Sequence, residues 1–186
     1  EICACLVGSE MCIRDRILAK SRLQIIPLGG LGEVGKNMTV FRYGDEIIVI
    51  DAGMAFPDET MPGVDIVIPD FSYLIENRDK IKAILITHGH EDHIGAIPYL
   101  LKRINLPVYA TALTLGLLEV KLKEHGLAGT AKLNRVKAGD HVRAGCFDME
   151  FIHVNHSISD AVAIALHSPA GVIVHTGDFK IDCTPT

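Results

Sequence analysis

Residues 88–93 bring three histidines and two carboxylates together within six positions. They read His88-Gly89-His90-Glu91-Asp92-His93 and directly follow the apolar run Lys82 to Thr87, which we predict to be a strand. Imidazole with carboxylate suits zinc, and also manganese or iron. In a tight loop after a buried strand, His88 and His90 can converge on one metal while Asp92 and His93 turn towards a second. A solvated surface loop that merely happens to be rich in histidine is a poor alternative at this density.

Short strands surround that loop in the predicted secondary structure. Leu23 to Leu28 suits a buried strand, and Gly29 to Gly35 reads as a turn-rich loop. Met38 to Tyr43 and Glu46 to Ile50 flank Gly44-Asp45, a dipeptide favoured in tight hairpins. The later predicted strands are Pro107 to Ala110, Ala131 to Val136, His141 to Ala144, Phe147 to Val154, Ala161 to Leu166 and Val172 to His175.

Two segments have apolar residues at helical spacing. The first is Ile94 to Ile104, and the second is Thr111 to His125, where Thr111 can cap the helix and Gly126 stops it. The predicted apolar stripe of the second helix consists of Leu113, Leu117, Val120 and Leu122. Hairpin strands, a middle of βαβ character and a further set of strands together predict a mixed α/β sandwich.

Composition sets bounds on the class of protein. The chain has 186 residues, of which 48% are apolar, enough for one core. No apolar run approaches the roughly 18 residues needed to span a bilayer. The net charge of −5 gives no sign of a basic nucleic-acid-binding domain, although acidic metal ligands lower that charge. The five cysteines lack the spacing of a disulfide framework or zinc finger, which favours a reducing, cytoplasmic setting.

The first sixteen residues differ in character from the rest. Leu6 to Arg16 resembles an in-frame translation of a transposase sequencing adapter, and the segment lacks the basic start and long apolar run of a signal peptide. We therefore expect residues 1–16 to be an adapter artefact and the native chain to begin near Ile17.

His88 to His93 is similar to the metal-binding signature of metallo-β-lactamase-fold hydrolases. In that family a later histidine and a later aspartate complete the site, and this chain has His156 in Asn155-His156-Ser157 and Asp178 in Thr176-Gly177-Asp178. Asp51-Ala52-Gly53 matches the family's first motif, whose aspartate supports the metal loop. The resemblance implies an αββα sandwich, of which residues 17–186 are the N-terminal portion.

The flanking motifs resemble the ribonuclease J family, the β-CASP ribonucleases of bacteria and archaea. They are Pro27 to Met38, Asp51 to Asp58, Thr87 to Leu101 and His175 to Lys180. The likeness runs from about Leu23 to the end of the chain and covers roughly the first third of the family's full length. The family usually has proline where this chain has Ser159, a difference that affects no ligand.

The resemblance implies a ligand set for two divalent ions, zinc or manganese. His88, His90, His156 and Asp178 would hold one ion, and Asp92, His93 and a bridging Asp178 the other. Asp92 and Asp178 would carry catalysis, in which two ions activate a hydroxide for in-line attack on an RNA phosphodiester. The family's last ligand and its β-CASP and C-terminal domains would lie beyond Thr186. The implied partners are an RNA substrate and, at full length, further copies of the protein, with no membrane.

Three other interpretations remain beside the ribonuclease. A thioester or lactam hydrolase resembling glyoxalase II carries the same six-residue motif, and a non-catalytic RNA-binding paralogue would usually have lost metal ligands. The spacing Gly30-x-Gly32-x-x-Gly35 matches a dinucleotide fingerprint, but a strand rather than a helix is predicted after it. The remaining histidines are predicted to be surface or packed residues, and His153 and His175, which are close to the ligands in sequence, are candidates to support them.

Overall fold

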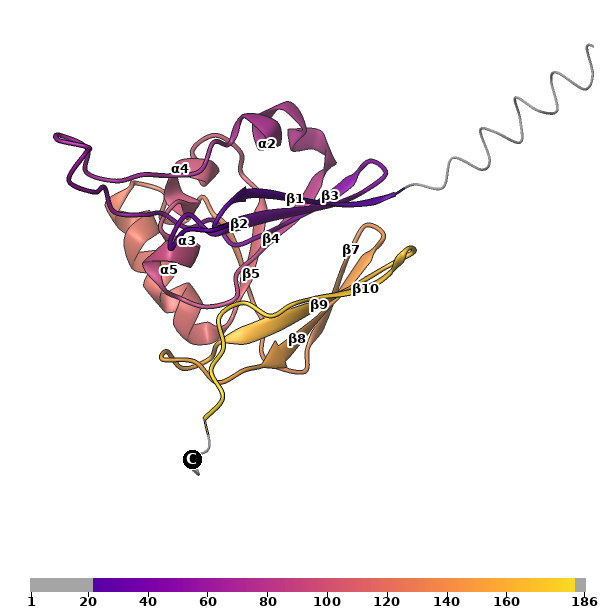
Figure 1. Cartoon of the computed structure of the whole chain (residues 1–186). Coiled ribbons are helices and arrows are strands. Elements are labelled where there is room, and N and C mark those ends of the chain that lie inside the picture. Colours follow the sequence, from indigo (N-terminus) through magenta and orange to yellow (C-terminus); the bar gives the residue numbers. More distant parts are fainter. Residues whose placement is uncertain (1–21, 183–186) are drawn as a thin grey trace, which may run out of the picture.

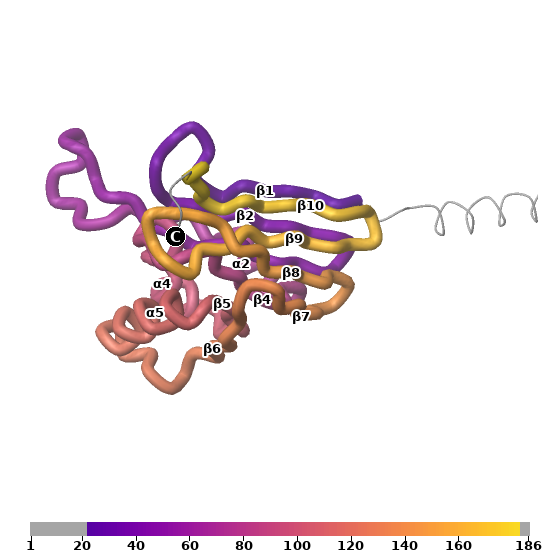
Figure 2. The backbone as a smooth tube through the Cα atoms, turned by 90° about the horizontal axis from the view of Figure 1, so that it is seen from below, coloured from indigo at the N-terminus to yellow at the C-terminus, as the bar shows by residue number. Residues whose placement is uncertain are grey.

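Two β-sheets face each other in the computed structural model, which describes residues 22–182 (Figure 1, Figure 2). The first sheet has the strand order β1-β2-β3-β4-β5-β6, and the second has the order β10-β9-β8-β7. The first comprises β1 (Leu23–Gly29), β2 (Met38–Tyr43), β3 (Glu46–Ile50), β4 (Ile81–Leu85), β5 (Pro107–Ala110) and β6 (Lys132–Arg135). The second comprises β7 (His141–Ala144), β8 (Phe147–His153), β9 (Val162–Ser168) and β10 (Gly171–His175).

Strand direction determines where loop residues gather. β1, β2 and β3 pair antiparallel, whereas β3, β4, β5 and β6 run parallel to one another. The carboxyl ends of those four parallel strands therefore share one edge of the sheet, the usual place for a binding site in such sheets. The second sheet joins the first at this edge, because Val162 N–H donates to the Thr87 carbonyl at 3.0 Å.

Helices cover one face of the first sheet (Figure 1). They are α2 (Ser72–Glu76), the 3₁₀ turn η1 (Arg78–Lys80), α3 (Glu91–Ile94), α4 (Ile97–Leu101) and α5 (Ala112–Glu124). One apolar core lies between these helices and the sheet, and a second lies between the two sheets around Phe41, Phe147 and Phe151. The outer face of the second sheet has no helix over it in the described part of the chain, and Val172 there is 59% exposed.

The predicted strands are all present, most of them within a residue or two of the predicted bounds. Gly44-Asp45 forms the tight turn between β2 and β3, with Tyr43 paired to Glu46. The prediction that Leu23 to Leu28 is buried is wrong, since β1 is an edge strand and Ile25 is 54% exposed. Its apolar composition matches that of central strands, but position in the sheet decides burial.

The helical predictions need two corrections. Ile94 to Ile104 is not one helix, because the helical hydrogen bonding is interrupted between α3 and α4. Ala96 N–H donates to the Ala52 carbonyl at 2.8 Å instead of continuing α3. Pro98, in the first turn of α4, has no N–H to bridge the break.

Helix α5 follows the predicted bounds but presents a different face to the sheet. It buries Leu115, Leu118 and Leu122, whereas Leu113, Leu117 and Val120 are exposed. Thr111 stands at the N-cap position, yet its hydroxyl bonds to Thr114 and the Asp160 carbonyl rather than to the helix backbone. Gly126, at φ +71, ends the helix as predicted.

The adapter-like segment, residues 1–16, lies outside the described residues. Among residues 22–182, no helix has the length and hydropathy that crossing a membrane requires.

Candidate metal centre

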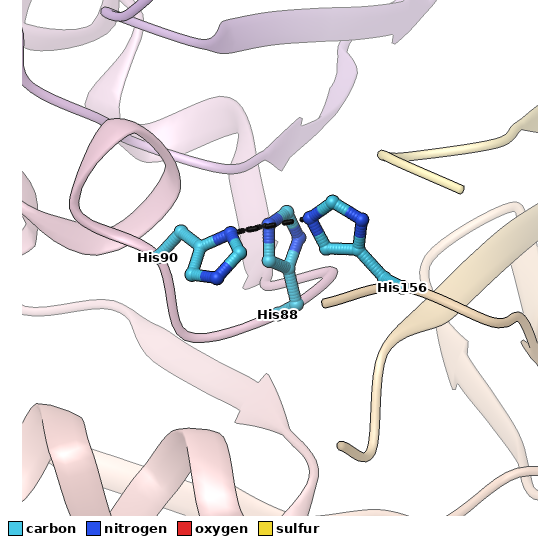
Figure 3. Close-up of side chains that lie close together, drawn as sticks. All are labelled: His88, His90 and His156. Carbon is cyan, nitrogen blue, oxygen red and sulfur yellow. Dashed lines mark hydrogen bonds between the residues drawn. The ribbon is translucent and has the colours of Figure 1, made fainter. Parts of the chain in front are cut away.

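The six predicted ligands come from three segments that meet at the shared edge of the two sheets. Residues 88–93 follow β4 and form the start of α3, His156 follows β8, and Asp178 follows β10. Because β4 runs towards this edge and β8 and β10 end near it, residues far apart in sequence lie side by side. Figure 3 shows the rings of His88, His90 and His156 turned towards one another.

Three imidazoles form the first ligand group. His90 Nδ1 lies 3.0 Å from His88 Nε2 and 3.2 Å from His156 Nε2 (Figure 3). The three nitrogens fall within 4.8 Å of one another, a spacing that a single metal ion could bridge. The other ring nitrogen of His88, Nδ1, lies 3.0 Å from the Thr87 hydroxyl, which leaves Nε2 available to bind a metal ion.

His93 and Asp178 form the second group together with His88. His93 Nε2 lies 3.5 Å from Asp178 Oδ2 and 3.6 Å from Asp92 Oδ2. Asp178 Oδ2 also lies 3.8 Å from His156 Nε2, so its carboxylate stands between the two groups. Asp92 belongs to neither set of three mutually close atoms, although it lies beside His93.

Asp51 supports the candidate metal loop, residues 88–93 together with the preceding Thr87. Its fully buried carboxylate accepts hydrogen bonds from the Thr87 N–H and hydroxyl, each at 2.8 Å, and lies 2.8 Å from His93 Nδ1. A proton shared on that side fixes the His93 ring and leaves Nε2 facing the ligand group. Burial opposes ionisation of Asp51, but the charge and hydrogen bond of His93, together with the hydrogen bond from the Thr87 N–H, outweigh it, so the pKa of Asp51 is lowered.

The backbone of residues 51–54 is bonded directly to the metal loop. Ala52 N–H donates to the His93 carbonyl at 2.9 Å, and Met54 N–H donates to the Glu91 carbonyl at 3.1 Å. Gly53 is required here, because a Cβ atom at this position would lie 1.5 Å from the carbonyl oxygen of Asp92. The Asp51-Ala52-Gly53 motif therefore fixes the position of the loop as well as one of its rings.

The donor set suits divalent metal ions. Burial lowers the pKa of His88 to about 4, so its ring is neutral and keeps a lone pair for a metal. Burial also opposes protonation of His93, but Asp51, Asp92 and Asp178 prevail and raise its pKa to about 9. Carboxylates that stabilise a cationic ring at this point would equally stabilise a metal cation bound to the neutral ring.

Asn37 is a site residue that the sequence analysis did not single out. Its side-chain amide lies 3.1 Å from His93 Nε2 and 3.3 Å from Asp92 Oδ2. Two features aim it there: Lys36 has a positive φ of 54°, and Asn37 N–H bonds to the Asp92 carbonyl at 3.1 Å. A non-glycine residue at positive φ cannot be recognised from sequence, so only its place after the glycine-rich loop could have drawn attention to Asn37.

The two histidines that are close to the ligands in sequence have different surroundings. His175 Nδ1 accepts the Gly177 N–H at 3.2 Å and so shapes the turn that carries Asp178. His153 is exposed and lines a hollow that His156 also lines.

Comparison with known proteins identifies the family of the chain. The family model described as the Metallo-beta-lactamase superfamily matches residues 31–184. The chain belongs to this superfamily. The predicted fold class is therefore confirmed, and the His/Asp cluster lies where a metallo-beta-lactamase-fold protein could hold its metal.

Curated relatives confirm the likeness to ribonuclease J. The chain is 51% identical over 173 residues to "Ribonuclease J" of Thermus thermophilus, covering 89% of this chain and 30% of that protein. It is 52% identical to the protein of that name from Synechocystis, covering 88% and 26%. Against the Helicobacter pylori protein the values are 53%, 90% and 24%. The chain thus spans less than a third of the length of these relatives.

Solved structures share the fold at low sequence identity. A protein of unknown function from Enterococcus faecalis V583 superposes with a TM-score of 0.63 at 20% identity, covering 85% of this chain and 44% of that chain. The metallo-beta-lactamase fold protein YhfI from Bacillus subtilis gives 0.60 at 16% identity, covering 88% and 65%. These likenesses concern the fold alone.

Proposed function

We propose that this chain carries the metal centre of a ribonuclease J-like enzyme that hydrolyses RNA phosphodiesters. The observation that carries the proposal is the convergence of histidines 88, 90, 93 and 156 with Asp178 at one sheet edge. The identity to ribonucleases J of three organisms, across about nine-tenths of this chain, supports RNA as the substrate class. In the full-length protein we expect 5′-to-3′ exonuclease and endonuclease activity, a cytoplasmic role in RNA decay and maturation, and a homo-oligomeric state.

The residues divide into two proposed metal positions. His88, His90 and His156, joined by Asp178, would hold the first ion, and His93, Asp92 and Asp178 would hold the second, zinc being our first choice. Ions held by these residues would lower the pKa of a bound water and offset charge on a phosphodiester. Asp178 is the proposed bridge, since its Oδ2 lies within 3.8 Å of both His93 Nε2 and His156 Nε2. Asp51 would keep the His93 ring oriented towards the second ion.

The test uses the full-length protein, stripped with a chelator and then reloaded with zinc or manganese. We expect reloading to restore hydrolysis of a 5′-monophosphorylated RNA, with a 5′ label separating release of mononucleotides from internal cleavage. S-lactoylglutathione serves as the matched thioester substrate and should remain intact. Hydrolysis of the thioester with RNA left intact would show a glyoxalase II-like enzyme, and RNA binding without metal-dependent cleavage would show a non-catalytic paralogue.

A further inference from the structure

A pocket of about 170 Å³ lies at the same sheet edge as the proposed metal centre. Its walls are the start of α5, the residues that end β6 and follow it, and the loop between β8 and β9. The lining comprises Thr111, Ala112, Arg135, Val136, Lys137, Ala138, His153, Asp160 and Val162. His153 and Asp160 also line a second hollow of about 390 Å³ whose wall includes His156, so the two hollows adjoin.

The pocket is rich in basic groups that lack partners. Arg135 and Lys137 are both exposed, and neither side chain forms an ion pair or hydrogen bond within residues 22–182. Asp160 is the single carboxylate of the lining, and it is exposed. The balance of charge in the pocket therefore favours an anion.

The start of α5 adds to this preference. The helix has 13 residues, no acidic side chain in its first turn, and no side chain that caps its backbone N–H groups. The hydroxyl of Thr111, at the N-cap, donates a hydrogen bond to the Asp160 carbonyl at 3.0 Å. Unbonded N–H groups and the helix dipole attract negative charge at such an end. The cations and the helix start thus line the same pocket from different elements.

The pocket lies within reach of the metal centre. His153, in its wall, precedes the proposed ligand His156 by three residues, so their Cα atoms are at most about 11 Å apart. The strand ends also align: β4, β5 and β6 are parallel neighbours, and they lead into the metal loop, into α5 and into Val136-Lys137 respectively. A short oligonucleotide could occupy both places at once.

Resting on the proposed function, we propose that this pocket binds a backbone phosphodiester of the RNA strand whose neighbouring bond is cleaved at the metal centre. Arg135 and Lys137 would pair with the phosphate oxygens, and the first N–H groups of α5 would face the same anion. The subsite takes the charge and shape of the backbone and no base, so it would act on any sequence.

The test compares two double variants of the full-length protein. Arg135→Ala with Lys137→Ala removes the pocket cations, and Lys123→Ala with Lys132→Ala removes two exposed lysines of α5 and β6 outside the pocket lining. Affinity for a short single-stranded RNA is measured in an Asp178→Asn background over a series of salt concentrations. We expect the pocket variant to bind about tenfold more weakly, with the slope of log affinity against log salt reduced by about 0.7 for each cation lost. The control should keep the original slope.

A third variant tests the lone carboxylate. Asp160 has a positive φ of 63°, a conformation that asparagine also tolerates, so Asp160→Asn removes charge with little strain. It should strengthen RNA binding by about two- to fivefold. In the active protein, hydrolysis of bis(p-nitrophenyl) phosphate, which has no further backbone phosphate, should fall much less than RNA hydrolysis when the pocket cations are removed.

Two results would overturn the subsite: equal losses in the pocket variant and the lysine control, or parallel losses on RNA and on bis(p-nitrophenyl) phosphate. The failure of the proposed function looks different. A wild-type protein that never cleaves RNA, yet whose pocket variant loses affinity and salt dependence, would refute the ribonuclease and retain the subsite.

Discussion

The two ends of β3 each carry a carboxylate, and the two are used differently. Glu46, at the start, accepts the Cys146 N–H and lies 3.7 Å from Lys82 Nζ, so it ties the second sheet to the first. Asp51, just past the end, holds Thr87 and His93, and His93 keeps its other nitrogen turned towards Asp178. Glu46 contacts Cys146 and Lys82, neither of which is a predicted ligand. Asp51 contacts one ring nitrogen of His93 and leaves the other, Nε2, facing Asp178. We infer that the first end serves stability and the second serves a site.

Backbone strain follows the same division. Asp51 adopts a positive φ of 60°, whereas the positive φ values near Glu46 belong to glycines, Gly44 at 61° and Gly145 at 63°, which adopt them without steric cost. A non-glycine residue in that region costs on the order of 1 kcal/mol and persists where the surrounding structure holds it. The strained residue is therefore at the end of β3 where the metal centre is proposed.

The largest effect is expected from Asp178, which contributes little to the fold. Its side chain is 46% exposed, so Asp178→Ala should leave the melting temperature nearly unchanged. Removing the proposed bridge should lower RNA hydrolysis by at least about a thousandfold. Hydrolysis assays in metal-controlled buffer, with thermal melting alongside, provide the measurement. Turnover at the wild-type level would exclude Asp178 as the bridge.

Two glycines that pack near opposite ends of β3 give the next contrast: Gly53, which follows the strand, and Gly145, which lies in the turn between β7 and β8 beside Glu46. Gly53→Ala would place a Cβ atom 1.5 Å from a backbone oxygen of the metal loop, whereas Gly145→Ala would meet the movable Glu46 carboxylate at 2.6 Å. We expect Gly53→Ala to cost more than about 3 kcal/mol and to lose bound metal, and Gly145→Ala to cost about 1–2 kcal/mol and to keep it. Denaturant unfolding and metal analysis measure both. Equal metal loss in the two variants would remove the contrast between the ends.

Asp51→Asn tests the supporting role of the buried carboxylate. The amide keeps the shape of the side chain but cannot hold the His93 ring as a carboxylate does, so metal affinity should fall by about 10- to 100-fold. Competition with a chromophoric chelator measures the affinity. Asp79→Asn serves as the control, because that side chain is 95% exposed and pairs only with the neighbouring Arg78 among residues 22–182. Equal affinities in both variants would mean that Asp51 does not position a ligand.

The smallest effect is expected from Glu46→Gln. Hydrogen bonds from the thiol and backbone of Cys146 lower the pKa of Glu46, and nearby Lys82 adds to this. A lowered folded pKa gives stability that is fully present above the unfolded value and is lost as pH falls through the folded value. The variant should lose about 1 kcal/mol at neutral pH and less in acid, with metal affinity unchanged. If Glu46→Gln lost the same folding stability at every pH, the charge of Glu46 would not contribute to that stability.

Sequence patterns were sufficient for the strands because alternation and turn chemistry are local. The hairpin around Gly44-Asp45 follows from its own residues, whereas burial of β1 depends on its edge position and was misjudged. Helix α5 has leucines on several sides, and the spacing of Leu113 and Leu117 is as helical as that of Leu115 and Leu118. Only packing against the sheet distinguishes those faces.

The metal loop could be predicted from residue types and spacing, but its distant partners could not. His156 and Asp178 were assigned from the family resemblance, since no local pattern links them to residues 88–93. Asn37 was not assigned, because its approach to His93 depends on the backbone turn at Lys36. Contacts between segments far apart in sequence require the fold.

The most direct test of the metal centre is an anomalous diffraction map, collected at the zinc edge, from crystals of the zinc-loaded full-length protein. We expect two peaks roughly 3.5–4 Å apart. One should lie among His88, His90 and His156, and the other beside His93 and Asp92, with Asp178 between them. A well-ordered map with no peak at these residues, or with its zinc bound elsewhere in the molecule, would contradict the account.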